Sequence, residues 1–128
     1  MGSEVKRVPV VLVVDDDDEV RLVACAHMEA LGLRILEASS GRQALDLMEN
    51  EVQVDILFSD VCMPGMSGAE LAEEVKRRRP NMLVILASGY MFSAETSYTV
   101  VPKPYRRHDL ERALAPLTSP QPEADIRH

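Results

Sequence analysis

Val10-Val11-Leu12-Val13-Val14 runs directly into Asp15-Asp16-Asp17-Asp18-Glu19, so an aliphatic segment ends in five successive acids. A continuous β-branched run is typical of a strand that is buried on both faces of a parallel sheet. Open α/β sheets bind their ligands at the carboxyl ends of such strands. Crowded carboxylates repel one another, and a hard cation such as Mg²⁺ offsets that repulsion. The segment therefore predicts a cation site connected with phosphate chemistry.

The composition indicates one globular domain with a core of its own. The chain has 128 residues, of which 46% are hydrophobic and 27% charged, as is ordinary for a soluble domain. Its net charge of −7 argues against a nucleic-acid-binding surface. No segment reaches the roughly 18 apolar residues of a membrane span, and the polar start does not resemble a signal peptide. We expect a cytoplasmic domain that contacts neither nucleic acid nor membrane.

The two cysteines point to the same compartment. Cys25 and Cys62 have neither the spacing of a metal site nor that of a disulfide framework. Such cysteines favour a reducing environment, and we expect each to be a buried free thiol.

Apolar runs alternate with helical patterns along the chain, which predicts a parallel sheet covered by helices on both faces. Five strands are expected, at Val8–Val14, Leu33–Ala38, Asp55–Ser59, Met82–Ala87 and Thr99–Val101. The first helix is expected to turn inward the residues Val20, Val23, Ala24, Met28 and Leu31. The last helix is expected over Asp109–Ala115, ended by Pro116. We expect an N-terminal extension over 1–7, a folded domain over 8–116 and a flexible polar tail over 117–128.

Four of the expected strands end in a reactive side chain. Asp15 and Asp16 follow the first strand, Asp60 the third, Ser88 the fourth and Lys103 the fifth. Parallel strand ends share one edge of the sheet, so these groups are expected to converge. The carboxylates can bind Mg²⁺, a cation neutralises phosphate oxygens, and the hydroxyl and ammonium can hold the remaining oxygens. One carboxylate is then free to act as a nucleophile and form an acyl phosphate.

Four segments carry a resemblance to a known family. In order, they are VLVVDD (11–16), SDVCMPGMSG (59–68), ASGY (87–90) and VPKPY (101–105). Together they resemble the receiver domain of bacterial response regulators, over about residues 9 to 115. The resemblance implies an α/β fold with one doubly wound, flavodoxin-like sheet of five parallel strands in the order 2-1-3-4-5.

The resemblance also implies a metal site. Asp15 and Asp16 match the family's acidic pair, with Asp16 touching the ion directly and Asp15 largely through water. Asp60 and the backbone carbonyl of Cys62 match the remaining protein ligands. The cofactor implied is Mg²⁺ or Mn²⁺.

A second set of roles concerns the phosphoryl group. Asp60 matches the phosphoacceptor, Ser88 the residue that hydrogen-bonds the phosphoryl group, and Lys103 the lysine that pairs with it. In the family the bond between this lysine and the proline after it, here Pro104, is cis. The donor implied is the phosphohistidine of a histidine kinase or phosphotransfer domain, or a small phosphodonor, and the acyl phosphate later hydrolyses. Such a domain catalyses its own phosphorylation and dephosphorylation but acts mainly as a switch, and the family admits a homodimer.

Two departures from the family pattern affect the output. Lys103 comes only fifteen positions after Ser88, so Met91–Ser97 is expected to form at most a turn or two of a shortened or irregular fourth helix. The family's switch aromatic lies three residues before the lysine, where this chain has Val100. The tyrosines considered as substitutes are Tyr90, Tyr98 and Tyr105.

Several readings remain open at this point. The ASGY segment and the short connection favour the receiver of a hybrid histidine kinase, in which case the full-length protein is a histidine kinase. The alternatives are a stand-alone response regulator, a pseudo-receiver that only binds partners, and a haloacid-dehalogenase-like phosphatase. The phosphatase reading rests on the loose motif Asp16-x-Asp18, but only Asp109 lies beyond Lys103 to supply its second acidic pair.

Overall fold

The computed structural model describes residues 8–50, 53–89 and 98–118, and these form a single five-stranded sheet with helices on both sides. All neighbouring strands are parallel, in the order β2-β1-β3-β4-β5. The strands are β1 (Val10–Val14), β2 (Arg34–Ala38), β3 (Ile56–Asp60), β4 (Leu83–Ser88) and β5 (Thr99–Pro102). The helices are α1 (Asp18–Ala30), α2 (Gly41–Asn50), α3 (Gly68–Arg78) and α4 (Arg107–Thr118). The predicted fold class and strand order are confirmed.

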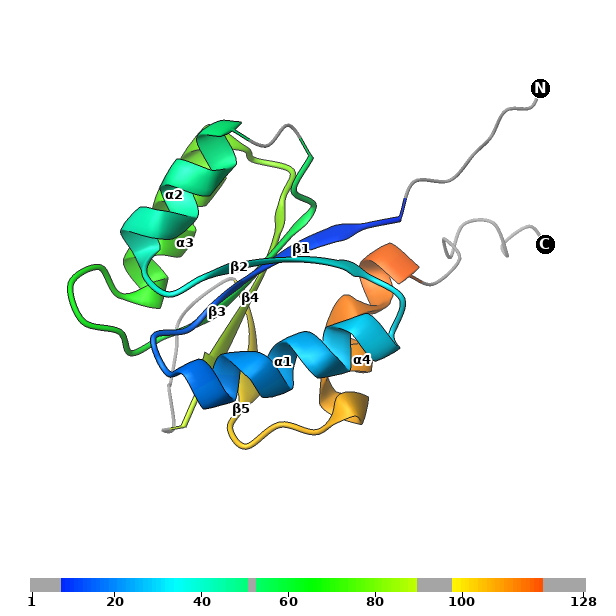
Figure 1. The fold of residues 1–128 in the computed structure, drawn as a ribbon. Coiled ribbons are helices and arrows are strands. Elements are labelled where there is room, and N and C mark those ends of the chain that lie inside the picture. Colours follow the sequence, from blue (N-terminus) through cyan, green and yellow to red (C-terminus); the bar gives the residue numbers. More distant parts are fainter. Residues whose placement is uncertain (1–7, 51–52, 90–97, 119–128) are drawn as a thin grey trace, which may run out of the picture.

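The sheet separates two hydrophobic cores. Figure 1 shows α1 and α4 over one face of the sheet and α2 and α3 over the other. Val11 and Val13 of β1 point into the core on the α1 side, whereas Leu12 and Val14 point into the core on the α2 side. Because successive strand residues point to opposite faces, a strand covered on both faces must be apolar throughout. This explains why every residue of β1 is buried.

The register of the sheet aligns the carboxyl ends of its inner strands. Val14 lies opposite Ser59 on β3, and Ser88 lies opposite Pro102 on β5. An aspartate follows Val14, another follows Ser59, and a lysine follows Pro102. These three residues therefore leave the sheet at one edge, as the sequence predicts.

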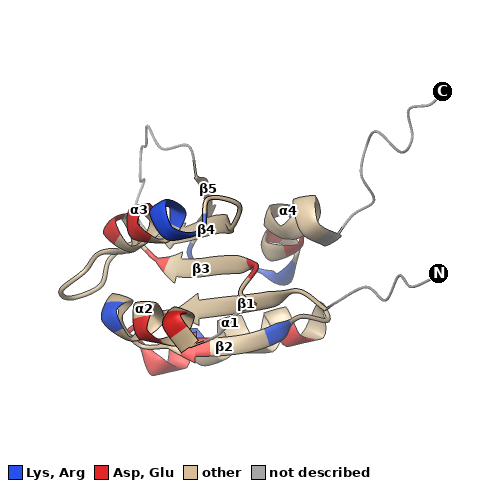
Figure 2. Ribbon diagram, turned by 90° about the horizontal axis from the view of Figure 1, so that it is seen from above, with Lys and Arg blue, Asp and Glu red and all other residues tan. Residues whose placement is uncertain are grey.

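Charged residues are kept away from the sheet interior. Figure 2 shows them on the helices, at strand ends and on the edge strand β2. Among the residues that the structure describes, no helix is long and apolar enough to cross a membrane.

Local capping signals fix the starts of two helices beside the acidic edge. The Asp17 carboxylate caps α1 by accepting hydrogen bonds from the backbone N–H groups of Glu19 and Val20. Ser67 and Glu70 form a reciprocal capping box at the start of α3. Each cap satisfies backbone donors that have no partner within the helix.

The structure corrects two predicted features of the helices. The α4 helix continues through Pro116 to Thr118; only two residues follow the proline, so its missing N–H and the crowding by its ring affect the last turn alone. Val23 is 51% exposed rather than inward. Cys25, two residues after Val23, is buried with Ala24 and Met28, so the inward face of α1 is rotated from the predicted one. The predicted short helix at Met91–Ser97 lies outside the described residues, as do the extension 1–7 and residues 119–128 of the tail.

Candidate functional site

Three carboxylates meet where β1 and β3 end. Asp15 is 5% exposed and Asp60 8% exposed, whereas Asp16 is exposed. One carboxylate oxygen from each of the three residues lies within 4.8 Å of those of the other two. The predicted convergence of these side chains is therefore observed.

Lys103 supplies the positive charge at this edge. Its ammonium lies 3.0 Å from Asp60 Oδ1 and 3.5 Å from Asp15 Oδ2. The side chain is 23% exposed, so it reaches the carboxylates from the protein surface. The peptide bond between Lys103 and Pro104 is cis, as the resemblance implies.

Burial and charge set the protonation behaviour of the site. Burial raises the pKa of Asp15 above its ordinary value, although the hydrogen bond from the Asp17 N–H and the charge of Lys103 act in the opposite direction. Burial also disfavours the charged form of Lys103, but its hydrogen bond to Asp60 and the nearby carboxylates outweigh this and raise its pKa. Lys103 is therefore cationic at neutral pH.

Ser88 is placed by its backbone. The residue is 4% exposed, and its carbonyl accepts a hydrogen bond of 2.9 Å from the Lys103 N–H. Asp60 lies opposite Ala87 on β4, so Ser88 is one residue further toward the site edge. Ser88 and Lys103 are thus joined through the main chain on neighbouring strands.

The segment after Asp60 is held by a close backbone approach. The Val61 N–H donates to the Ala87 carbonyl at 2.9 Å, and the Gly68 N–H donates to the Val61 carbonyl at 2.8 Å. A Cβ atom on Gly68 would lie 2.1 Å from the Asp60 carbonyl oxygen, which is far inside van der Waals contact. Glycine at 68 therefore lets α3 begin directly against the end of β3.

Cys62 departs from the expectation of a buried thiol. Cys25 is buried but Cys62 is exposed, because Cys62 lies in the surface loop between β3 and α3, where side chains have no core to enter. The role of its backbone carbonyl as a metal ligand remains a prediction.

The aromatic side chains near the site lie on both faces of the sheet. Val100 is half-buried and, with Tyr98, packs against the core on the α2 side. Tyr105 packs on the α1 side, where its ring is edge-to-face with that of Phe58 at a centroid distance of 5.4 Å. Tyr90 lies outside the described residues. Two of the three candidate switch tyrosines therefore contact opposite cores.

A hollow of about 470 Å³ opens beside the lysine. Its lining comes from the start of α1 and the segment after β5, namely Glu19, Val20, Val23, Lys103, Pro104 and Tyr105. The lining is mostly apolar, and it accounts for the exposure of Val23 on this side of α1.

The donor set fits a hard divalent cation. Carboxylate oxygens are the ligands that Mg²⁺ prefers, and Mg²⁺ usually takes only one or two of them together with water and phosphate oxygens. Asp15, Asp16 and Asp60 offer three such groups, one of which faces solvent. The same edge offers an ammonium that can pair with phosphate oxygens.

Comparison with known proteins gives the family. The model of the response regulator receiver domain matches residues 11–115. The chain belongs to the response regulator receiver domain family. It is 33% identical over 119 residues to the sensor kinase CckA of Brucella abortus, covering 87% of this chain and 13% of that protein. The receiver therefore spans a small part of the length of this curated relative.

Solved receiver structures are similar to this one over most of the chain. The receiver domain of the hybrid histidine kinase CckA is 36% identical, with a TM-score of 0.72, covering 84% of this chain and 96% of that one. The response regulator protein TrrA from Thermotoga maritima, solved in complex with Mg²⁺-BeF, is 25% identical, with a TM-score of 0.78, covering 85% of this chain and 98% of that one. Membership of the family sets aside the phosphatase alternative.

Arg21 and Gly68 are not among the predicted site residues, although both shape this receiver's acidic edge. The signal for Gly68 is a glycine at the helix start just after the MPGM segment. The signal for Arg21 is its spacing of three residues from Asp18, which brings opposite charges together on a helix. Only the structure shows that Arg21 also reaches beyond its own helix.

Proposed function

We propose that this receiver accepts a phosphoryl group on Asp60. The observation that carries the proposal is the meeting of Asp15, Asp16 and Asp60 within 4.8 Å of one another, with the Lys103 ammonium 3.0 Å from Asp60. A buried carboxylate held beside a fixed cation is suited to nucleophilic attack on phosphorus.

In the proposed reaction a carboxylate oxygen of Asp60 attacks the phosphorus of a phosphohistidine. The new bond joins that oxygen to phosphorus, the N–P bond breaks, and the electron pair returns to the donor imidazole. Lys103 balances charge on the phosphoryl oxygens, and Ser88 supplies a hydroxyl donor. Hydrolysis reverses the modification, because water attacks phosphorus and restores the Asp60 carboxylate while releasing inorganic phosphate.

Asp15 and Asp16, with Asp60 and the carbonyl of Cys62, are the proposed ligands of Mg²⁺ or Mn²⁺. When bound, the cation neutralises negative charge on the phosphoryl oxygens. The complex of TrrA with Mg²⁺-BeF, a related receiver, supports this choice of metal.

We propose a cytoplasmic histidine kinase or phosphotransfer domain as the donor, and the receiver of a hybrid histidine kinase as the context. The resemblance to the sensor kinase CckA and to the receiver of the hybrid kinase CckA supports that context. The hollow beside Lys103 offers a place where the phosphoryl-donor protein can approach Asp60, because Lys103 lies 3.0 Å from Asp60 and the hollow is lined mostly by apolar side chains. A stand-alone regulator would show the same chemistry without an attached kinase.

The test is incubation with acetyl phosphate or phosphoramidate and Mg²⁺, followed by intact-mass measurement. We expect a gain of one phosphoryl group in the wild type. The gain should not occur when EDTA removes Mg²⁺ or when Asp60 is replaced in Asp60→Asn, and hydroxylamine should remove the group once it has formed. Asp46→Asn, at an exposed position on α2, is the matched control and should be labelled like the wild type. An unmodified wild type would indicate a pseudo-receiver, and a labelled Asp60→Asn would refute the acceptor assignment.

A further inference from the structure

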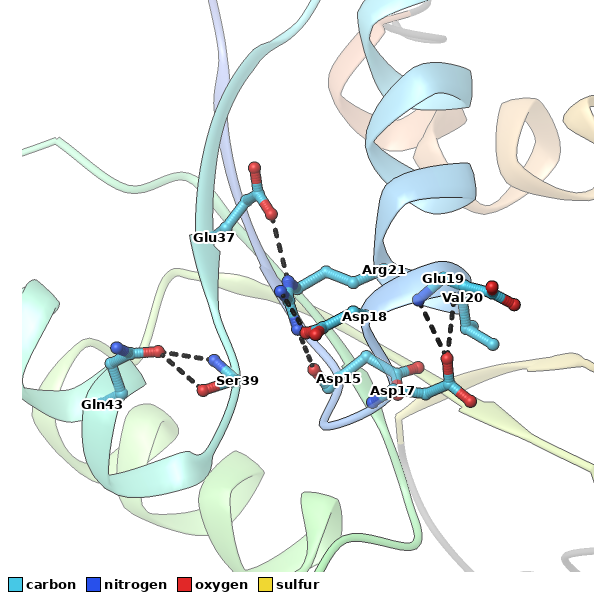
Figure 3. A network of polar contacts seen from close by, with 9 residues as sticks. All are labelled: Asp15, Asp17, Asp18, Glu19, Val20, Arg21, Glu37, Ser39 and Gln43. Atoms are coloured by element: carbon cyan, nitrogen blue, oxygen red, sulfur yellow. Dashed lines mark hydrogen bonds and ion pairs between the residues drawn. The ribbon is translucent and has the colours of Figure 1, made fainter.

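The guanidinium of Arg21 joins three parts of the chain at the acidic edge. Nη1 donates to the backbone carbonyl of Asp15 at 2.7 Å. Nη2 donates to the Asp18 carboxylate at 2.7 Å, and Nε donates to Glu37 of β2 at 3.0 Å. Figure 3 shows Arg21 reaching from α1 to all three partners. The Arg21 side chain is only 16% exposed, whereas the carboxylates of Asp18 and Glu37 are exposed, so the arginine itself is held against the protein.

Arg21 contributes to the different environments of the four successive aspartates, residues 15–18. Asp15 Oδ1 accepts from the Asp17 N–H at 2.9 Å, Asp17 caps α1, and Asp18 is bound by Arg21. Among the described residues, Asp16 has no hydrogen-bond or ion-pair partner, although its carboxylate lies with those of Asp15 and Asp60. The four adjacent carboxylates therefore have four different environments.

We infer that Arg21 is a positioning residue for the metal site of this receiver. It holds the carbonyl of Asp15 just after β1 and pairs with the Asp18 carboxylate, so that Asp16 is the remaining member of the run whose carboxylate lies with those of Asp15 and Asp60. The inference rests on the proposed function, because it assigns cation binding to that set. Residues that orient metal ligands typically change metal affinity by about 10- to 100-fold when they are replaced.

Positioning and simple electrostatics predict opposite results for Arg21→Gln. Removing a positive charge near a cation site should strengthen Mg²⁺ binding if charge alone mattered. Loss of the three-way contact should instead weaken binding by about tenfold, because the loop from Asp15 to Asp18 is no longer held. Arg21→Lys keeps the charge but cannot reproduce the planar fork, so it should also weaken Mg²⁺ binding, by a smaller factor.

The experiment measures the Mg²⁺ dissociation constant by calorimetry for the wild type, Arg21→Gln, Arg21→Lys and the control Arg77→Gln. Arg77 forms an ion pair with Glu74 on α3, away from the site. Circular dichroism checks that each variant folds, and the more conservative Arg21→Lys covers the case in which Arg21→Gln does not. We expect weaker binding in both Arg21 variants and an unchanged constant in Arg77→Gln.

A second readout uses the rate of labelling by acetyl phosphate as Mg²⁺ is varied. The half-saturating Mg²⁺ concentration should rise in the Arg21 variants, while the rate at saturating Mg²⁺ stays within about twofold of wild type. Unchanged or tighter Mg²⁺ binding in both variants overturns the inference, as does a wild type that binds no Mg²⁺. If the wild type binds Mg²⁺ but is not phosphorylated by acetyl phosphate, the proposed function is wrong. The calorimetric comparison of Mg²⁺ binding still decides the role of Arg21 in that case.

Discussion

Lys103 and Asp60 form an ion pair of 3.0 Å between the ends of β5 and β3, two strands that do not pair with each other. The contact crosses over β4. The carbonyl of Ser88, the last residue of β4, accepts a hydrogen bond from the Lys103 N–H. Among the described residues, the cationic partner of the Asp60 carboxylate is therefore Lys103, which follows the edge strand β5. This geometry makes Lys103 the first residue to test.

Replacement of Lys103 by methionine should slow labelling by acetyl phosphate by about 100-fold, the usual cost of removing one preorganised charge-stabilising group. Lys103→Arg keeps the charge but not the compact ammonium, and its rate should fall between those of the wild type and the methionine variant. The measurement is the initial rate at saturating Mg²⁺. A methionine variant within twofold of wild type would contradict the role assigned to Lys103.

Replacement of Asp16 by asparagine should stabilise the metal-free protein by about 1 kcal/mol, because it removes one of three mutually repelling carboxylates. The same change should reduce or abolish the stabilisation that Mg²⁺ confers, which is about 2.7 kcal/mol for a wild type at 100 times the dissociation constant. Urea unfolding in EDTA and in Mg²⁺ measures both effects. Asp46→Asn is the control and should leave both values close to wild type.

Gly68→Ala should destabilise the protein by about 3 kcal/mol or more, because its Cβ would meet the Asp60 carbonyl at 2.1 Å. Relief of the clash requires α3 or the end of β3 to move, so labelling at Asp60 should fall as well. Gly89→Ala is the matched control, since a Cβ there meets no atom within 4 Å. Equal stability of the two alanine variants would show that the close approach at Gly68 is not required.

The two cysteines should differ in reactivity. Cys62 is exposed and Cys25 is buried, and burial raises the pKa of the Cys25 thiol from 9.0 to about 11. Ellman's reagent at pH 8 should titrate about one thiol per folded chain rapidly, and a second only in urea. Cys62→Ser should remove the rapid phase, and a rapid phase that persists would contradict this assignment.

The same shift gives stability a dependence on alkaline pH. The Cys25 thiol loses its proton at lower pH in the unfolded chain than in the folded one, so the folded state binds more protons between pH 9.0 and about 11. The contribution of Cys25 to stability should therefore fall as pH rises through that window. Comparison of urea unfolding at pH 8.5 and 10.5 for wild type and Cys25→Ala tests this, and the pH-dependent loss should be smaller in the variant.

The sheet and the carboxylate cluster were predictable because both follow from strongly patterned segments. A buried parallel strand needs an uninterrupted apolar run, and β1 and β3 have one that ends in aspartate. Parallel strand ends share one edge, so the approximate position of Lys103 followed from the placement of β5. These inferences require only periodicity and chain direction.

Other features depend on packing that a linear pattern does not encode. The inward face of α1 differs from the prediction at Val23, because helical spacing alone does not define the angle at which a helix meets the sheet. The helix α4 extends past its predicted end at Pro116 to Thr118, because its end depends on how the preceding turns pack as well as on the proline. Arg21 escaped prediction because its partner Asp15 follows β1 whereas its partner Glu37 lies on β2.

The lysine of this site follows an edge strand of the sheet. Strand β5 has a neighbour on only one side, so it has about half the interstrand hydrogen bonds of an inner strand. Asp60, by contrast, ends a strand clamped between β1 and β4. A change in the charge opposite Lys103 would therefore act on a margin of the sheet that is held from one side, whereas Asp60 is held from both. Any movement of that margin would be felt by Val100 and Tyr105, which rest against opposite cores.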